Sequence, residues 1–134
     1  ITINKYHFMK SVFAAFIALF LVTGVIGQSK KPADVAKFGS ETVDLGKPKV
    51  GNPVTATFTF TNTSKEDLVI ETVTPGCGCT KSDYTKEPIK PGKTGTITAT
   101  YNAAAVGNFT KKVYVKFLGI DQQQELTIMG NVQQ

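Results

Sequence analysis

The chain has 134 residues, which is the length of one domain, and a formal net charge of +5. All 15 basic residues are lysines, so the chain lacks the guanidinium fork that reads phosphates and guanine bases, and this argues against nucleic-acid binding. One histidine and two cysteines cannot build a multi-histidine metal site or complete a tetrahedral zinc site.

The N-terminal region has the parts of a secretory signal. A basic residue, Lys10, follows Met9, an unbroken apolar run covers residues 12–22, and small residues come next. The run is well short of the roughly 20 apolar residues that a membrane-spanning helix needs. We therefore predict a signal peptide over residues 9–27, with residues 1–8 arising from translation upstream of Met9. An uncleaved anchor helix is the alternative.

Cleavage before Gln28 would change the character of the chain. It would remove His7, the one histidine, and it would leave no stable membrane span in the mature protein. No cysteine follows the apolar run, so we do not expect a lipid-modified N-terminus. The predicted location is the periplasm or the extracellular medium.

The rest of the chain divides into a short tether and a β-rich domain. Residues 28–37 are polar and rich in lysine, which is typical of a tether. Residues 38–134 alternate short β-rich runs with turn signals, and no stretch keeps apolar residues at helical spacing. Six runs are predicted as strands: Thr42–Leu45, Val54–Thr61, Leu68–Val73, Gly95–Tyr101, Phe109–Leu118 and Glu125–Val132.

The apolar residues within these runs alternate with polar ones. Ala56, Phe58 and Phe60 are separated by threonines, and so are Ile97 and Ala99. A strand with this pattern buries one face and exposes the other. Six or seven such strands in about 100 residues favour an all-β fold, an immunoglobulin-like β-sandwich of about seven strands. A closed small barrel is the alternative.

A Cys-Gly-Cys segment stands apart from this pattern. The two cysteines of the chain are Cys77 and Cys79. Gly76 precedes them and Gly78 lies between them. In an extended strand, residues i and i+2 lie ~6.6 Å apart, which is near the upper limit of Cα separation for a disulfide. The glycines would let the backbone bend and bring the sulfurs together. Closing so small a loop stabilises the fold by roughly 1.6 kcal/mol before strain is subtracted.

Three interpretations of this pair remain open. The cysteines could form a local structural disulfide, or they could be a redox pair that exchanges with a partner thiol. They could also bind a soft metal such as Cu(I), for which two thiolates are suitable ligands. No resident cofactor is expected otherwise. Met129 lies in a core-like strand and is interpreted as a packing residue.

Other polar residues do not form a catalytic pattern. The mature chain has no histidine to activate a hydroxyl, so we do not expect an enzyme. Four lysines follow the Cys-Gly-Cys segment and are interpreted as a solvated surface: Lys81, Lys86, Lys90 and Lys93.

The stretch from Leu68 to Phe117 resembles a known family. It contains Cys-Gly-Cys-Thr, then the pattern PIKPGKTGTI, then GNFTK. These motifs resemble the bacterial envelope family known as domain of unknown function 1573. The resemblance implies an immunoglobulin-like fold and an exported bacterial protein, and it implies no activity. The motif residues that accompany the two cysteines are Gly76, Gly78, Thr80, Pro91 and Gly92.

Two functions follow as hypotheses. The first is an exported, non-catalytic binding or scaffold module of the bacterial cell envelope, with an unidentified envelope protein as partner. The second is a periplasmic thiol-redox or copper-handling protein that uses Cys77 and Cys79.

Overall fold

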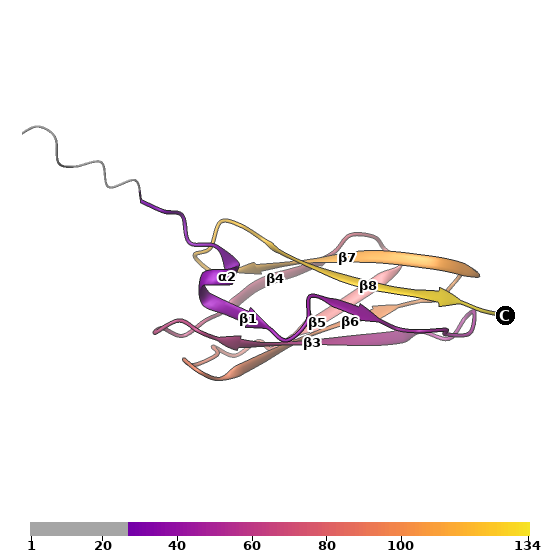
Figure 1. The fold of residues 1–134 in the computed structure, drawn as a ribbon, viewed down its shortest axis with the longest axis horizontal. Helices are drawn as coiled ribbons and strands as arrows, with labels where there is room; N and C mark the ends of the chain where they lie inside the picture. The colour runs from indigo at the N-terminus through magenta and orange to yellow at the C-terminus, as the bar shows by residue number, and fades with distance from the viewer. Residues whose placement is uncertain (1–26) are drawn as a thin grey trace, which may run out of the picture.

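Two four-stranded sheets stack face to face in the computed structural model, which describes residues 27–134 (Figure 1). Sheet A has the strand order β1-β3-β6-β5, and sheet B has the order β2-β8-β7-β4. Neighbouring strands are antiparallel except β2 and β8, which run parallel. The elements are α2 (Pro32–Val35), β1 (Ala36–Phe38), β2 (Thr42–Asp44), β3 (Val54–Asn62), β4 (Ile70–Pro75), β5 (Thr80–Tyr84), β6 (Thr94–Tyr101), β7 (Gly107–Phe117) and β8 (Gln124–Val132).

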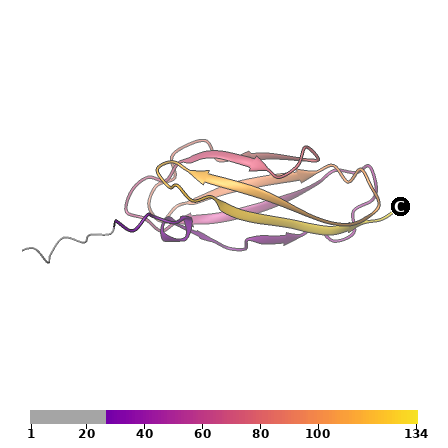
Figure 2. The same ribbon diagram turned by 90° about the horizontal axis from the view of Figure 1, so that it is seen from above.

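This arrangement confirms the predicted immunoglobulin-like β-sandwich. The sheets are separate layers, so the alternative of a closed barrel is wrong. Seen from above, the indigo segment with β1 and β2 runs along one long side of the sandwich, and β5 runs along the opposite side (Figure 2). The predicted upstream residues and, except for Gly27, the predicted signal peptide lie outside the described residues.

The core forms where the alternating strands face each other. Phe58, Phe60, Ile97 and Ala99 are buried, as their alternation predicts. Phe117 of sheet B meets Phe60 of sheet A edge-on, with ring centroids 5.4 Å apart. Burying such aromatic side chains supplies the largest share of hydrophobic stabilisation in a small domain.

The outer face of sheet A is lined with threonine. Four cross-strand pairs join β3 to β6 on this face: Thr55 with Thr100, Thr57 with Thr98, Thr59 with Thr96 and Thr61 with Thr94. Threonine is branched at Cβ and polar, so it favours the extended backbone while tolerating water. The same alternation therefore produces both the apolar core and this hydroxyl-rich face.

The N-terminal boundary differs from the prediction. The sequence predicts a tether over residues 28–37, but these residues contain α2 and the beginning of β1, and Val35 and Ala36 are buried. Two small apolar residues among lysines carry little periodic signal. They join the core because β1 pairs with β3, with Ala36 opposite Asn62.

Strand β5 was not predicted at all. Its sequence, TKSDY, has one apolar residue, so it shows none of the alternation used to find strands. It forms because its backbone pairs with β6, with Thr80 opposite Tyr101 and Tyr84 opposite Ile97. Strand β4 also begins two residues later than predicted and continues to Pro75, directly before the Cys-Gly-Cys segment.

Candidate functional site

The Cys-Gly-Cys segment forms the turn that connects β4 of sheet B to β5 of sheet A. On one side, Gly76 donates its N–H to the carbonyl oxygen of Lys112 in β7 at 2.8 Å. On the other side, Asn102 donates its N–H to the carbonyl oxygen of Cys79 at 3.0 Å. The turn is therefore anchored by backbone hydrogen bonds to both sheets.

Only one of the two glycines has a steric role here. A Cβ atom at Gly76 would lie 3.1 Å from the carbonyl oxygen of Lys112, so glycine permits the close approach of the two backbones. A Cβ atom at Gly78 would meet nothing within 4 Å. Gly76 is therefore required for the approach of the turn to β7, and neither glycine has the left-handed φ that would make glycine necessary for the bend itself.

Cys77 and Cys79 are joined by a disulfide. Their Cα atoms are 5.3 Å apart, which is closer than the ~6.6 Å of an extended strand because the chain turns between them. The N–H of Thr80 closes this turn onto the carbonyl oxygen of Cys77 at 3.3 Å. Both cysteines are half-buried, so part of the bond faces solvent.

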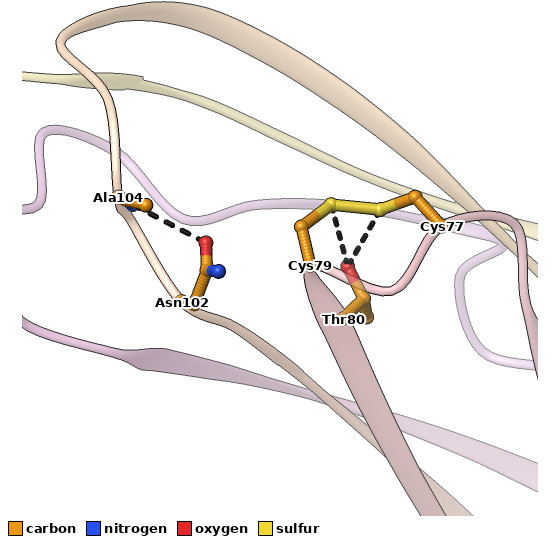
Figure 3. The surroundings of a disulfide bond; sticks show 5 residues. All are labelled: Cys77, Cys79, Thr80, Asn102 and Ala104. Atoms are coloured by element: carbon orange, nitrogen blue, oxygen red, sulfur yellow. Dashed lines mark hydrogen bonds between the residues drawn. A yellow bond between two sulfur atoms is a disulfide. The ribbon is translucent and has the colours of Figure 1, made fainter.

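Thr80 lies directly against the disulfide. Its side chain is buried, and its Oγ1 is 3.7 Å from the Sγ of Cys77 and 3.9 Å from the Sγ of Cys79 (Figure 3). A hydroxyl in this position can donate to either sulfur, and such a donor favours a thiolate over a thiol if the bond is reduced. Across from it, Asn102 accepts the N–H of Ala104 at 3.2 Å and shapes the loop that faces the bond.

The remaining motif residues lie elsewhere. Pro91 and Gly92 belong to the loop between β5 and β6, at the end of these strands away from the disulfide. Gly92 has a φ of +76° and donates its N–H to the carbonyl oxygen of Asn62 at 2.8 Å. Glycine adopts this left-handed conformation without a steric penalty, so Gly92 has a structural role.

Asn62 is a central residue that the sequence did not reveal. Its buried side chain donates to the carbonyl oxygens of Glu66 at 2.7 Å and Ile89 at 2.8 Å. Its Oδ1 accepts the N–H of Ser64 at 2.9 Å and the Ser64 hydroxyl at 2.7 Å. In the sequence, Asn62 is an asparagine at the end of a strand and the first residue of the tripeptide Asn-Thr-Ser, and neither feature predicts these hydrogen bonds. These hydrogen bonds join the loop between β3 and β4 to the loop between β5 and β6.

The interpretation of Met129 as a packing residue is wrong. Its side chain is 40% exposed on the outer face of β8, because the inward positions of this strand are the even-numbered Leu126 and Ile128. The strand register therefore places Met129 on the opposite face from the core.

Two of the four lysines that follow the turn form surface ion pairs. Lys86 lies 3.1 Å from Asp83, and Lys90 lies 3.5 Å from Asp67. The N–H of Tyr84 and then Lys86 lower the pKa of Asp83. A hydrogen bond from Lys112 to Glu125, 2.8 Å long, raises the pKa of Lys112. The side chains of Asp83 and Lys112 are both exposed, so these shifts reflect hydrogen bonds and ion pairs at the surface.

Within residues 27–134, no three His, Cys, Asp or Glu side chains gather closely enough to hold a metal ion. The same part of the chain contains no helix with the length and apolar character needed to cross a membrane.

A family model for proteins of unknown function, DUF1573, matches residues 36–132. The chain belongs to this family. The match begins at the first residue of β1 and ends at the last residue of β8, so it covers the whole sandwich. No curated protein matches the chain.

Solved structures with the same fold come from several sources. A protein of unknown function from Porphyromonas gingivalis W83 is 14% identical with a TM-score of 0.62, over 72% of this chain and 46% of that one. The VesB protease of Vibrio cholerae is 16% identical with a TM-score of 0.59, over 90% of this chain and 35% of that one. PapD-like domain 7 of human CEP192 is 9% identical with a TM-score of 0.57, over 85% and 96% of the two chains.

These similarities concern the fold alone. The chain spans less than half the length of the Porphyromonas gingivalis and Vibrio cholerae proteins. The fold occurs as part of longer proteins, and a shared fold does not imply a shared function.

Proposed function

We propose that this member of the DUF1573 family is an exported, non-catalytic binding or scaffold module of the bacterial cell envelope. The observation that carries the proposal is the disulfide between Cys77 and Cys79. Disulfides persist in oxidising compartments such as the periplasm and are rare in the cytosol. The signal-like segment at residues 9–27 points to the same compartment.

The binding or scaffold role is supported by how the surface is built. The outer face of sheet A presents hydroxyl groups, and the shifted pKa values belong to two exposed side chains, Asp83 of β5 and Lys112 of β7. Sandwich domains bind partners through their edges, faces and loops, and this requires no reactive side chain.

Fractionation of the native bacterium tests the proposed compartment. The protein is expected in the envelope or secreted fraction, with a mass that begins near Gln28 and with thiols that react with an alkylating agent only after reduction. Recovery from the cytoplasm with two freely reactive thiols would contradict the proposal.

Thiol exchange at the turn is the second candidate function, favoured by the Thr80 hydroxyl beside both sulfurs. A partner thiolate would attack one sulfur, break the Cys77–Cys79 bond and form a mixed disulfide. A second partner thiolate would then release a partner disulfide, and the two electrons would remain on this chain as two thiols. Only this reduced form would offer two thiolates to Cu(I).

A trapping variant separates the two candidates. In Cys79→Ser, the remaining Cys77 thiolate would attack the disulfide of an oxidised partner and release one partner thiol. The resulting mixed disulfide would accumulate because Cys79 is absent and cannot resolve it, and it would be visible as a band that a reducing agent removes. The matched control is the double variant Cys77→Ser/Cys79→Ser, which cannot form such a band. If neither variant changes the redox state of other envelope proteins, and the reduced protein binds no Cu(I), the exchange and copper functions are excluded.

A further inference from the structure

Strand β3 is paired along only part of one edge. Strand β1 covers its C-terminal end, where Phe38 lies opposite Phe60, and Gly39 donates a last N–H to the carbonyl oxygen of Thr59 at 3.0 Å. The chain then leaves sheet A, and β2 pairs with β8 of sheet B. We call the uncovered part of β3, residues 54–58, the open edge.

The direction of the backbone groups at the open edge follows from the strand register. In an antiparallel strand, alternate residues direct their N–H and C=O groups to the same side. Thr63 donates to Val35, and Thr59 accepts from Gly39, so the odd-numbered residues of β3 face the β1 side. Thr57 and Thr55 therefore direct two N–H and two C=O groups outward, where no strand of the described chain pairs with them.

Apolar side chains accompany this row of backbone groups. Val54 at the start of β3 is half-buried, and so are Val43 and Leu45 in and beside β2. All three side chains pack against the core and remain partly exposed to solvent. An extended strand at the open edge could place alternate side chains on these residues, while its other side chains would extend the row of threonines.

The edge strands on the opposite side of the sandwich have features that discourage the addition of another strand, and the open edge lacks these features. Strand β5 is an edge strand with two charged residues, Lys81 and Asp83, and edge charges discourage strand addition. Strand β4 has an irregular register near Ile70, and side chains of β5 bind its outward carbonyl groups. By contrast, the nine residues of β3 include no charge and no proline.

We propose that the open edge binds an extended segment of another protein, which adds to sheet A as an antiparallel strand next to β3. The inference rests on the proposed binding function and assigns it a surface and a kind of partner. The segment would alternate apolar with small polar residues, because its side chains face the core gap and the threonine face in turn. Main-chain hydrogen bonds to Thr55 and Thr57 would supply the register.

The size of the open edge favours a peptide segment over a second copy of the chain. Five residues span only ~17 Å. The area of a strip of this length and one strand wide is much smaller than the ~800 Å² per partner that a stable interface buries. A single extended segment can form its main-chain hydrogen bonds within this strip and requires no further contact area.

The chain contains a suitable probe. Residues 94–101, TGTITATY, form β6, which pairs with β3 on its other edge and has the required alternation. In the proposed antiparallel complex the threonines of this peptide face Thr57, because opposed residues in such a pair share one face. Methylation of the peptide nitrogens at Thr96 and Thr98 should abolish binding, whereas methylation at Ile97 and Ala99 should preserve it.

Amide hydrogen exchange in the full chain is the readout. With the peptide present at up to about 1 mM, exchange at Thr55 and Thr57 should slow by about tenfold or more. The variant Thr57→Pro removes an outward N–H without removing a bond to β6, and it should lose the effect. The matched variant Thr57→Val keeps the N–H and should retain it. Because the methylated peptides act on the unaltered protein, the test does not depend on how Thr57→Pro folds.

Three results would overturn the inference. These are no protection of Thr55 and Thr57 by the unmodified peptide, equal binding of both methylated peptides, or full binding by a folded Thr57→Pro protein. A dimer in sedimentation experiments without peptide, absent in Thr57→Pro, would show that a second copy is the occupant instead. None of these results bears on the envelope fractionation, so the compartment and the binding surface can fail separately.

Discussion

The two long sides of this sandwich are closed in different ways. On the β4–β5 side, the disulfide turn links the sheets directly, and Ser82 and Tyr84 donate to the carbonyl oxygens of Val73 and Glu71 at 3.1 and 3.3 Å. On the β1–β2 side, one segment crosses from sheet A to sheet B and leaves part of β3 unpaired. On the first side, neighbouring side chains bond to backbone carbonyl groups of the edge strand. On the second side, backbone N–H and C=O groups of β3 have no strand beside them in the described part of the chain.

The difference shows how connection length affects an edge. A turn of four residues holds β4 and β5 close together, so side chains of one strand can reach backbone groups of the other. The β1–β2 segment instead divides its three-residue strands between two sheets, so neither is long enough to cover its neighbour. Exposed backbone groups of this kind are a template for another strand.

The largest expected effect comes from the aromatic contact that holds the β1–β2 side to the core. Phe60→Ala removes a buried ring that packs on Phe38 of β1 at 5.2 Å and on Phe117 at 5.4 Å. We expect the free energy of unfolding to fall by about 3–5 kcal/mol, measured by denaturant titration. The neighbouring exposed variant Thr59→Ala should change it far less, and equal effects would contradict the assigned core.

A smaller effect is expected where the crossing segment lies on β8. A Cβ atom at Gly130 would lie 2.8 Å from the ring of Phe109 and 2.9 Å from the carbonyl oxygen of Gly46. Gly130→Ala should therefore destabilise the fold by about 1–3 kcal/mol, because a backbone must move. On the other side, Gly78→Ala has open space and should be nearly neutral. Thermal unfolding of both variants checks the contrast.

The side-chain bonds of the β4–β5 side should contribute less still. Ser82→Ala and Tyr84→Phe each remove one donor to a β4 carbonyl, and we expect a loss of about 0.5–1.5 kcal/mol for each. Exchange of amides in β4 should also become faster in the double variant. Unchanged stability and exchange would show that these bonds do not protect the edge.

The smallest effect is a dependence on pH at β5. The N–H of Tyr84 and then Lys86 hold the pKa of Asp83 below its ordinary value of 3.8. This carboxylate therefore stabilises the fold fully above its unfolded pKa, and the contribution is lost as the pH falls through the lower folded pKa. The melting temperatures of the native protein and Asp83→Asn should converge as the pH falls below 3.8 and through the lower folded pKa. A constant difference across this range would contradict the assignment.

Much of the sandwich could be predicted because its central strands alternate strictly. Phe58, Phe60, Ile97 and Ala99 were assigned to the core from their spacing, and they are buried. The period of two is a property of the extended backbone itself, so it is visible in the sequence whenever one face is buried. Strand β5 could not be found this way, since its pairing with β6 depends on backbone groups and not on its side chains.

The candidate site was only partly predictable. The spacing of Cys77 and Cys79 indicated a possible disulfide, but the buried hydroxyl of Thr80 beside both sulfurs depends on how β5 packs. Side-chain surroundings of this kind arise from residues distant in sequence, and local pattern does not encode them.

By itself, the sequence determined the fold class, the inward residues of the long strands and the one turn that contains sulfur. The tertiary structure decided which strands lie at the edges of the sheets and whether the backbone groups of each edge have hydrogen-bond partners. The physical reason is that side-chain alternation is set within a strand, whereas the fate of a backbone N–H or C=O depends on the neighbour that folding brings beside it. The open edge of β3 is visible only at that second level.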